Sequence, residues 1–326
     1  MRGSQPAQGE RSPTMAKLIG LLHGEEETFP TAFIEEVNAR KAGVVAEAVR
    51  VGGVRADQPV GYDLIVDRMS HRVNFYRDYL KFAVATGQTL CINDPFRVEQ
   101  DNRFLRARLG QQAGLKVPRS VLLPSCDYPA GLDGPALSNL VYPLPWEEML
   151  AYVGLPALVR PIRGERPAAA RVNNLKDLWE AYGRTGQAVA ELTETIPRDQ
   201  SVAVFCVGKA TYPVAYDAVA RRYQIEKKLD SRLASRARQG ASRLVASLGL
   251  DMASVELAVH QHDLYLIDLD ACPTFDWWAL SEDLFIHLVA SVADLAIERL
   301  QRQPQAPKEA TPSPRSKNLS NTKAKS

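Results

Sequence analysis

A chain of 326 residues with 45% hydrophobic side chains is long enough to form two or three packed subdomains. Its formal net charge of +2 arises from basic ends, so the body of the chain is slightly acidic and a basic nucleic-acid groove is not indicated. The four cysteines stand singly, without a CxxC pair, which argues against a zinc site and a disulfide framework. No apolar run has the length of a membrane span and no signal-peptide pattern is present. We therefore expect a reduced, cytoplasmic protein that contacts neither membranes nor nucleic acid.

The two ends of the chain lack the residues needed for a hydrophobic core. Residues 1–15 are rich in Gly, Ser, Gln and Pro, and residues 304–326 are rich in Pro, Ser and Lys. We expect a disordered head and a disordered basic tail. Met15 directly precedes the first apolar run, so Met1 and Met15 are both candidates for the true start.

Residues 16–96 alternate between short apolar runs and segments with helical spacing. Strands are predicted at Lys17–Leu22, Val44–Val51, Tyr62–Val66 and Thr89–Ile92, and helices at Thr31–Arg40 and Arg72–Thr86. In the second helix we expect Phe75, Tyr79 and Phe82 to lie on one face. The alternation predicts an α/β domain with a parallel sheet.

Residues 97–303 combine further helices and strands. Asp101 is the predicted N-cap of a helix that Gly114 ends, with Leu105 on its inner side. Residues 125–143 are rich in Pro, Gly, Asp and Ser and predict a loop. The remaining predicted helices are Trp146–Val153, Lys176–Gly183, Arg232–Leu248 and Glu282–Leu300, and the strands are Val117–Leu123, Pro156–Pro161, Gln187–Ile196 and Ser201–Val207.

The segment Ser254–Asp276 predicts a β-hairpin that carries clustered acids. Apolar residues alternate with others in its first strand, and the second strand ends at Asp270. Such a hairpin sets Glu256, Asp268 and Asp270 close together near one sheet surface. Because three neighbouring carboxylates repel one another and are costly to desolvate, we expect Mg²⁺ to bind them. The alternative is that one carboxylate faces solvent while the others pair with Arg or cap the backbone.

Five local sequences occur in an order that resembles the ATP-grasp superfamily, of the glutathione synthetase and ribosomal-protein-modifying ligase type. They are INDP at 92–95, DNRF at 101–104, GLKVPRSVLLP at 114–124, PALVRP at 156–161 and SVELAVHQHDLYLIDLD at 254–270. A YD…RY element at 216–223 adds a likeness to bacterial ATP-grasp proteins of unassigned substrate. The resemblance implies an α/β ATP-grasp fold over residues 97–303, with a lid-like subdomain at about 140–197. A parallel α/β pre-ATP-grasp domain would precede it at 16–96.

The same resemblance implies that ATP binds between two sheets. Arg103 and Arg160 stand where the family usually has Lys, and we expect both on the phosphates. The backbone from Glu194 to Ile196 would bind the adenine edge, with the Glu194 carboxylate as the polar contact.

The family's metal ligands correspond to Glu256, Asp268 and Asp270 in this sequence. Asn is usual at the third of these places, so Asp270 is a departure from the pattern. A shift of one residue would put Ala271 there instead, and both registers stay open.

The function that the resemblance implies is an ATP- and Mg²⁺-dependent ligase. It would join a small-molecule or peptide carboxylate to an amine or thiol through an acyl phosphate, with Arg222 on the acceptor carboxylate. A homodimer is a candidate assembly. Two departures favour the alternative of a degenerate ATP-grasp protein that binds nucleotide or a partner without catalysis. The loop after Pro161 has one glycine where a glycine-rich loop is expected, and Ala203 replaces an Arg.

Overall fold

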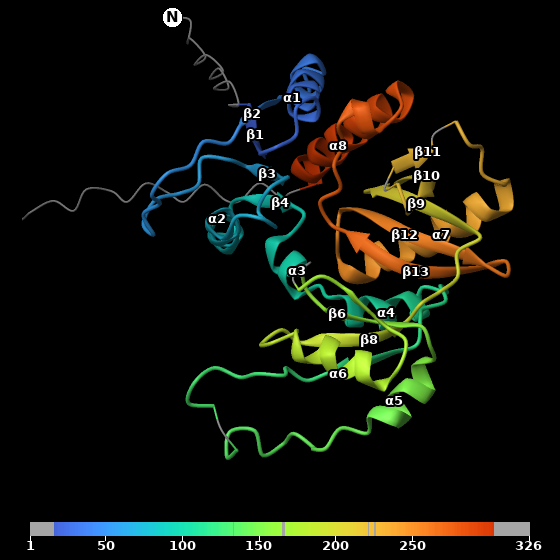
Figure 1. The fold of residues 1–326 in the computed structure, drawn as a ribbon. Coiled ribbons are helices and arrows are strands. Elements are labelled where there is room, and N and C mark those ends of the chain that lie inside the picture. The colour runs from blue at the N-terminus through green and yellow to red at the C-terminus, as the bar shows by residue number, and fades with distance from the viewer. Residues whose placement is uncertain (1–15, 133, 165–166, 221, 225, 303–326) are drawn as a thin grey trace, which may run out of the picture.

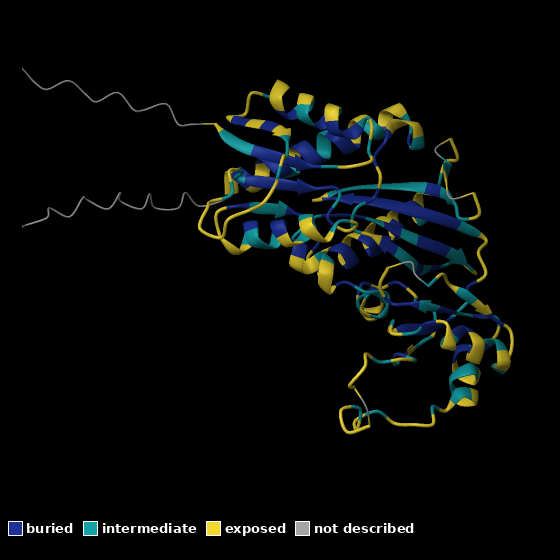
Figure 2. Cartoon of the chain, turned by 60° about the vertical axis from the view of Figure 1, so that its left-hand side comes forward, coloured by how far each residue is buried: buried dark blue, intermediate teal, exposed yellow. Residues whose placement is uncertain are grey.

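The computed structural model describes residues 16–132, 134–164, 167–220, 222–224 and 226–302, so the predicted disorder of the head and tail concerns residues outside this description. The chain forms three sheets with helices packed on them (Figure 1). The first sheet lies within residues 17–92, the second within 200–270 and the third within 120–194, so the third precedes the second in the sequence. Buried residues follow the sheets and the inner sides of the helices (Figure 2). Within the described part of the chain, every helix is too short or too polar to cross a bilayer.

The first sheet is parallel throughout, as the alternating pattern predicts, with the order β2-β1-β3-β4. Its elements are β1 (Lys17–Leu22), α1 (Phe29–Ala39), β2 (Val44–Ala48), β3 (Leu64–Asp67), α2 (Asn74–Ala85) and β4 (Leu90–Ile92). In α2 the face predicted to carry Phe75, Tyr79 and Phe82 is buried at Tyr79 but not at Phe75, which is 47% exposed. The apolar stripe of α2 passes through Tyr76 instead and continues to Tyr79 and Leu80.

The second sheet is antiparallel, with the order β11-β10-β9-β12-β13. Its strands are β9 (Gln200–Val207), β10 (Ala210–Asp217), β11 (Arg222–Gln224), β12 (Met252–His260) and β13 (Asp263–Asp270). β10 was not predicted, because it contains Pro213 and is half-buried along most of its length rather than alternating. Helix α7 (Ser231–Leu248) covers one face of this sheet. After the short η1 (Trp277–Ala279), helix α8 (Glu282–Arg302) packs between the other face and the first sheet (Figure 1).

The third sheet is also antiparallel, with the order β5-β8-β6-β7. Its elements are β5 (Ser120–Leu123), α5 (Trp146–Val153), β6 (Ala157–Pro161), β7 (Ala170–Val172), α6 (Leu175–Gly183) and β8 (Ala190–Glu194). Helices α5 and α6 cover one face through a separate hydrophobic cluster. The predicted loop at 125–143 contains no helix or strand among its described residues and extends away from the sheet (Figure 1).

Two short helices, α3 (Pro95–Gln100) and α4 (Arg103–Gln112), connect the first sheet to the third. The prediction that Asp101 caps α4 is wrong, because Asn102 Oδ1 accepts the Leu105 N–H at 2.9 Å and is the cap. Asp101 turns inward. Leu105, predicted on the inner side, is 38% exposed. The inner side of α4 is marked by Gly110, where an added Cβ would come within 2.8 Å of Leu266 on β13.

Candidate active site

The hairpin of β12 and β13 carries three carboxylates on one face. A two-residue turn with φ values of +49° and +67° joins the strands. Glu256 pairs with Asp268 across the strands, and Ser254 pairs with Asp270. Since side chains alternate along a strand, Glu256, Asp268 and Asp270 share one face, which we call the acid face. This register favours Asp270 over Ala271 as its third member.

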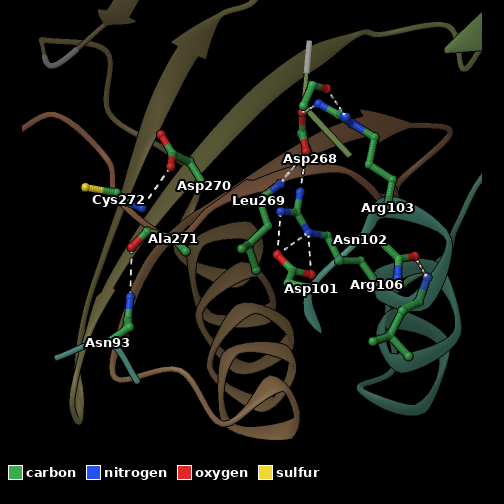
Figure 3. A network of polar contacts seen from close by, with 12 residues as sticks. Asn93, Asp101, Asn102, Arg103, Arg106, Asp268, Leu269, Asp270, Ala271 and Cys272 are labelled. Atoms are coloured by element: carbon green, nitrogen blue, oxygen red, sulfur yellow. Dashed lines mark hydrogen bonds and ion pairs between the residues drawn. The ribbon is translucent and has the colours of Figure 1, made fainter. Parts of the chain in front are cut away.

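Asp268 is bound by two arginines of helix α4 (Figure 3). Arg106 Nη1 donates to Asp268 Oδ1 at 2.6 Å, and Arg103 Nη2 donates to Asp268 Oδ2 at 3.3 Å. Asp101 holds Arg106 in turn, with both carboxylate oxygens 2.9 Å from Arg106 Nε. For Asp268 the structure therefore shows the alternative to Mg²⁺ binding given in the sequence analysis, in which the acid pairs with Arg.

Arg103 also connects the acid face to the segment that follows β6. Its Nη1 donates to Gly164 O at 2.8 Å and to Pro161 O at 3.2 Å. Its backbone N–H donates to Ile162 O at 3.0 Å. Arg103 Nε is buried and has no hydrogen-bond partner among the described residues.

Arg160 lies on β6 and pairs with a buried glutamate of β8. Arg160 Nε donates to Glu191 Oε1 at 2.7 Å, and the Glu191 side chain is 2% exposed. Glu191 alternates along β8 with Ala190 and Leu192, which belong to the cluster under α5 and α6. Glu191 therefore faces away from that cluster. Sequence reasoning missed this residue, although the alternation that points to it is visible in the sequence.

These side chains line one cleft between the second and third sheets. Its walls include Arg103 and Arg106 of α4, Arg160 and Glu191 of the third sheet, and Asp268 of β13. The cavity volume within this cleft is about 20 Å³, far below that of a ligand pocket, so its own side chains nearly fill it and a ligand would have to separate them. The structure thus brings together Arg103, Arg160 and Asp268, which lie far apart in the sequence.

Solved structures with the same arrangement of sheets identify the fold. A RimK-domain ATP-grasp protein of Sphaerobacter thermophilus has a TM-score of 0.63 and 16% identity, and the match covers 85% of this chain and 98% of that one. The D-Ala:D-Ser ligase VanG of Enterococcus faecalis has a TM-score of 0.62 and 13% identity, over 87% and 99% of the two chains. The ATP-grasp ligase PsnB, solved with precursor peptide PsnA2 and AMPPNP, has a TM-score of 0.58 and 15% identity, over 88% and 99%.

This chain has the ATP-grasp fold. No protein-family model and no curated protein sequence matches it, so the likeness rests on structure. The predicted fold class is confirmed: the parallel first sheet precedes two antiparallel sheets, and the candidate cleft lies between those two.

The other two acid-face carboxylates of this ATP-grasp fold do not line the cleft. Glu256 accepts from Arg198 Nη1 at 2.7 Å. Burial raises the pKa of Glu256 above its usual range, and Arg198, which lowers it, does not cancel this. Asp270 is exposed and accepts the Cys272 N–H at 2.8 Å.

The donor chemistry of the acid face suits Mg²⁺, but the arrangement of the carboxylates does not. Among the described residues, no group of three or more His, Cys, Asp or Glu side chains is placed to hold a metal ion. In addition, Asp268 is bound by the guanidinium groups of Arg103 and Arg106. Glu256, Asp268 and Asp270 therefore do not fit a cage of three carboxylates, and their role as metal ligands stays a prediction.

The stretch predicted to bind the adenine follows β8. The Glu194 carboxylate accepts from Arg119 Nη2 at 2.9 Å and from Arg119 Nε at 3.1 Å, so it is already in an ion pair. Ile196 is 8% exposed. Thr195 Oγ1 is buried without a hydrogen-bond partner in the described residues. Sequence reasoning missed Thr195, whose hydroxyl is the available polar group here.

Arg222, the predicted catalytic residue, lies at the opposite edge of the second sheet. It is exposed at the start of β11, where it pairs with Asp217 of β10. Strands β10, β9 and β12 separate β11 from β13, and adjacent strands are about 4.8 Å apart. The structure therefore does not bring Arg222 into the cleft. Sequence reasoning missed Arg106, which does line the cleft. Arg106 lies three residues after Arg103, and residues three apart on a helix share a face.

Proposed function

We propose that this chain is an ATP-dependent ligase that joins a carboxylate to an amine or a thiol. The observation that carries the proposal is the convergence of Arg103, Arg160 and Asp268 on one cleft between two sheets of an ATP-grasp fold. Structures that this chain resembles include the ligases VanG and PsnB. Two buried donors in this region, Arg103 Nε and the Thr195 hydroxyl, support the binding of a polar ligand.

The proposed reaction has two steps. A carboxylate oxygen attacks the γ-phosphorus of ATP and ADP leaves, which produces an acyl phosphate. The amine or thiol then attacks the carbonyl carbon and phosphate leaves. No side-chain nucleophile takes part, so catalysis consists of positioning and charge neutralisation. Arg103 and Arg160 would supply the positive charge, and each guanidinium can bind two phosphate oxygens.

The remaining predicted groups have narrower roles in the proposal. Thr195 and the backbone from Glu194 to Ile196 would bind the base. Magnesium would enter with the triphosphate, because Mg²⁺ is usually bound by substrate phosphates and one or two carboxylates. Glu256 and Asp270 are the acid-face carboxylates that helix α4 leaves uncovered.

Arg222 lies on the face of the second sheet opposite the acid face, so its position does not bear on the choice of acceptor. PsnB and the macrocyclase MdnC were each solved with a precursor peptide. We therefore propose small-molecule or peptide carboxylates and amines as substrates, with a peptide as the first choice. The homodimer and the cytoplasmic location stay predictions.

A second candidate function is nucleotide or partner binding without catalysis. Ala203 lies opposite Glu256 in the sheet, so β9 contributes no cation at this point of the acid face. Arg103, Arg106 and Arg160 are each paired with an acid, which leaves the cleft close to neutral before any ligand binds. Both observations favour binding over turnover.

Thermal unfolding with ATP and an assay of ADP release separate these candidates. The ligase proposal predicts that ATP raises Tm and that ADP is released only with a matching carboxylate and amine from a peptide and amino-acid panel. Arg103→Gln should abolish both effects. Arg108→Gln is the control, because Arg108 lies on the same helix and, among the described residues, its side chain bonds only Gln111, at 3.4 Å. A rise in Tm without ADP release across the panel would establish the second candidate, and no effect of ATP would refute both.

A further inference from the structure

The three carboxylates of the acid face have unequal partners. Asp268 Oδ1 accepts from Arg106 and from the Leu269 N–H at 2.8 Å. Glu256 has Arg198, whose side chain is 36% exposed, whereas the Arg106 side chain is 15% exposed. Of the three, Asp268 is therefore the one with an enclosed cation against it.

The Arg106 guanidinium is fixed in place. Its Nε and Nη2 both donate to Asp101, with Nη2 2.5 Å from Asp101 Oδ2, and its Nη1 donates to Asp268. Asp101 is 4% exposed, so this side-on pair is shielded from water and sets the direction of the third nitrogen. The side chain therefore cannot swing away from Asp268 without breaking the buried pair.

The charge of Arg106 is permanent. A guanidinium stays protonated in proteins, and this one is held between the carboxylates of Asp101 and Asp268. A divalent cation on Asp268 would lie beside this fixed positive charge, and like charges at such short range repel strongly where water is partly excluded.

We infer that Arg106 is a built-in counter-cation of Asp268 and that this carboxylate is not a metal ligand. A divalent cation that arrives with a nucleotide is then confined to the Glu256 and Asp270 side of the acid face. The statement about the nucleotide rests on the proposed function. The statement about Asp268 concerns the protein alone, and its test uses a metal ion without nucleotide.

Binding of Mn²⁺ alone, followed by electron paramagnetic resonance of the free ion, tests the inference on the wild-type protein. The wild type and Asp268→Asn should bind Mn²⁺ equally, whether weakly or not at all, because Asp268 contributes no ligand. A loss of about tenfold or more in Asp268→Asn, which corresponds to about 1.4 kcal/mol, would overturn the inference.

A double variant tests the same point in the other direction. Asp101→Asn with Arg106→Gln removes the guanidinium together with its buried partner, so no buried charge is left unpaired and Asp268 is uncovered. Its Mn²⁺ affinity should rise by about tenfold or more, and adding Asp268→Asn should remove the gain. Glu99→Gln with Arg108→Gln is the matched control, since it removes the same two charges from the same segment at exposed positions.

The outcomes separate the two proposals. A folded double variant without increased Mn²⁺ affinity overturns the inference about Arg106. If the double variant does not fold by circular dichroism, the comparison of the wild type with Asp268→Asn decides, made at Mn²⁺ concentrations high enough for the wild type to bind the ion. If the Mn²⁺ results agree but ATP leaves Tm unchanged, the inference stands and the proposed function falls.

Discussion

Arg68 and Arg106 are both arginines that pair with a carboxylate, and their surroundings differ in one respect. The Arg68 side chain is 0% exposed and that of its partner Glu26 is 9% exposed. The guanidinium lies over the rings of Phe29 and Phe275, at 5.0 and 4.5 Å from the centroids, and also donates to Pro273 O. Arg106 has one enclosed partner, Asp101, and one partner that is 34% exposed, Asp268.

The difference separates a closed ion pair from an open one. In the closed pair around Arg68, every group that could bind a ligand is covered by protein, so the pair can only hold the first sheet against the segment that follows β13. In the open pair, Asp268 keeps one side toward the cleft, so a ligand can reach it while Arg106 stays in place. We expect closed pairs to control stability and open pairs to control binding.

The largest predicted effect is the loss of the closed pair. Arg68→Met should lower the free energy of unfolding by about 4 kcal/mol, because it leaves Glu26 as an unpaired buried charge. Urea unfolding measures this change. Arg72→Met is the matched control: Arg72 pairs with the neighbouring Glu25, but their side chains are 54% and 71% exposed, so the cost should be under about 1 kcal/mol. Equal costs for the two variants would contradict the role of Arg68 in a closed pair that controls stability.

Arg160 and Glu191 test an intermediate case, since Glu191 is 2% exposed and Arg160 is 20% exposed at the cleft. Arg160→Gln should cost about 3 kcal/mol of stability, because Glu191 is left buried without its partner. Adding Glu191→Gln should restore most of the stability but not the affinity for ATP, because the phosphate-binding charge is still missing. If the double variant regains ATP binding, Arg160 has no role on the phosphates.

A neutral side chain, that of Asn93, also links the end of the first sheet to the hairpin. Asn93 Nδ2 donates to Met252 O and Ala271 O, at 2.7 and 2.8 Å, and its Oδ1 accepts the N–H of Asp251 and of Met252. Asn93→Ala should cost about 2–3 kcal/mol in urea unfolding, because it leaves buried backbone groups without partners. Asn139→Ala, in an exposed part of the long loop, should leave stability unchanged. A loss of stability no larger than that expected for an exposed ion pair would show that water bonds these backbone groups in place of the Asn93 amide.

Local patterns in the sequence were sufficient for much of the fold. The parallel first sheet follows from strands and helices that alternate within 16–96, and the acid face follows from the period of two in a single hairpin. The resemblance predicted that Arg103 and Arg160 lie in the same cleft, and both line it. The first sheet and the acid face depend on residues that are near neighbours in the sequence. Arg103 and Arg160 were found because each belongs to a short motif of the family.

The ion pairs of the cleft were not predictable in the same way. Arg106 and Asp268 are 162 residues apart and Arg160 and Glu191 are 31 apart, so neither pair follows from helical or strand spacing. Asp101 has the sequence of an N-cap, but Asn102 beside it is equally suited, and the buried Arg106 decides between them. Which acid meets which arginine is fixed by how the sheets pack.

The smallest predicted effect concerns pH and compares two glutamates with opposite pKa shifts. Burial raises the pKa of Glu256, so the folded chain holds that proton more tightly than the unfolded chain, and ionised Glu256 costs stability at neutral pH. Glu256→Gln should therefore stabilise the protein at pH 7 by under about 1 kcal/mol, since Arg198 is partly exposed. The gain should disappear as the pH falls toward 4.5, the ordinary pKa of a glutamate.

Glu194 has the opposite shift. The hydrogen bond from Arg119 lowers the pKa of Glu194, so ionised Glu194 adds stability above pH 4.5 that is lost below it. Glu194→Gln should therefore destabilise the protein at pH 7, and a change of the same sign in both variants would contradict the comparison.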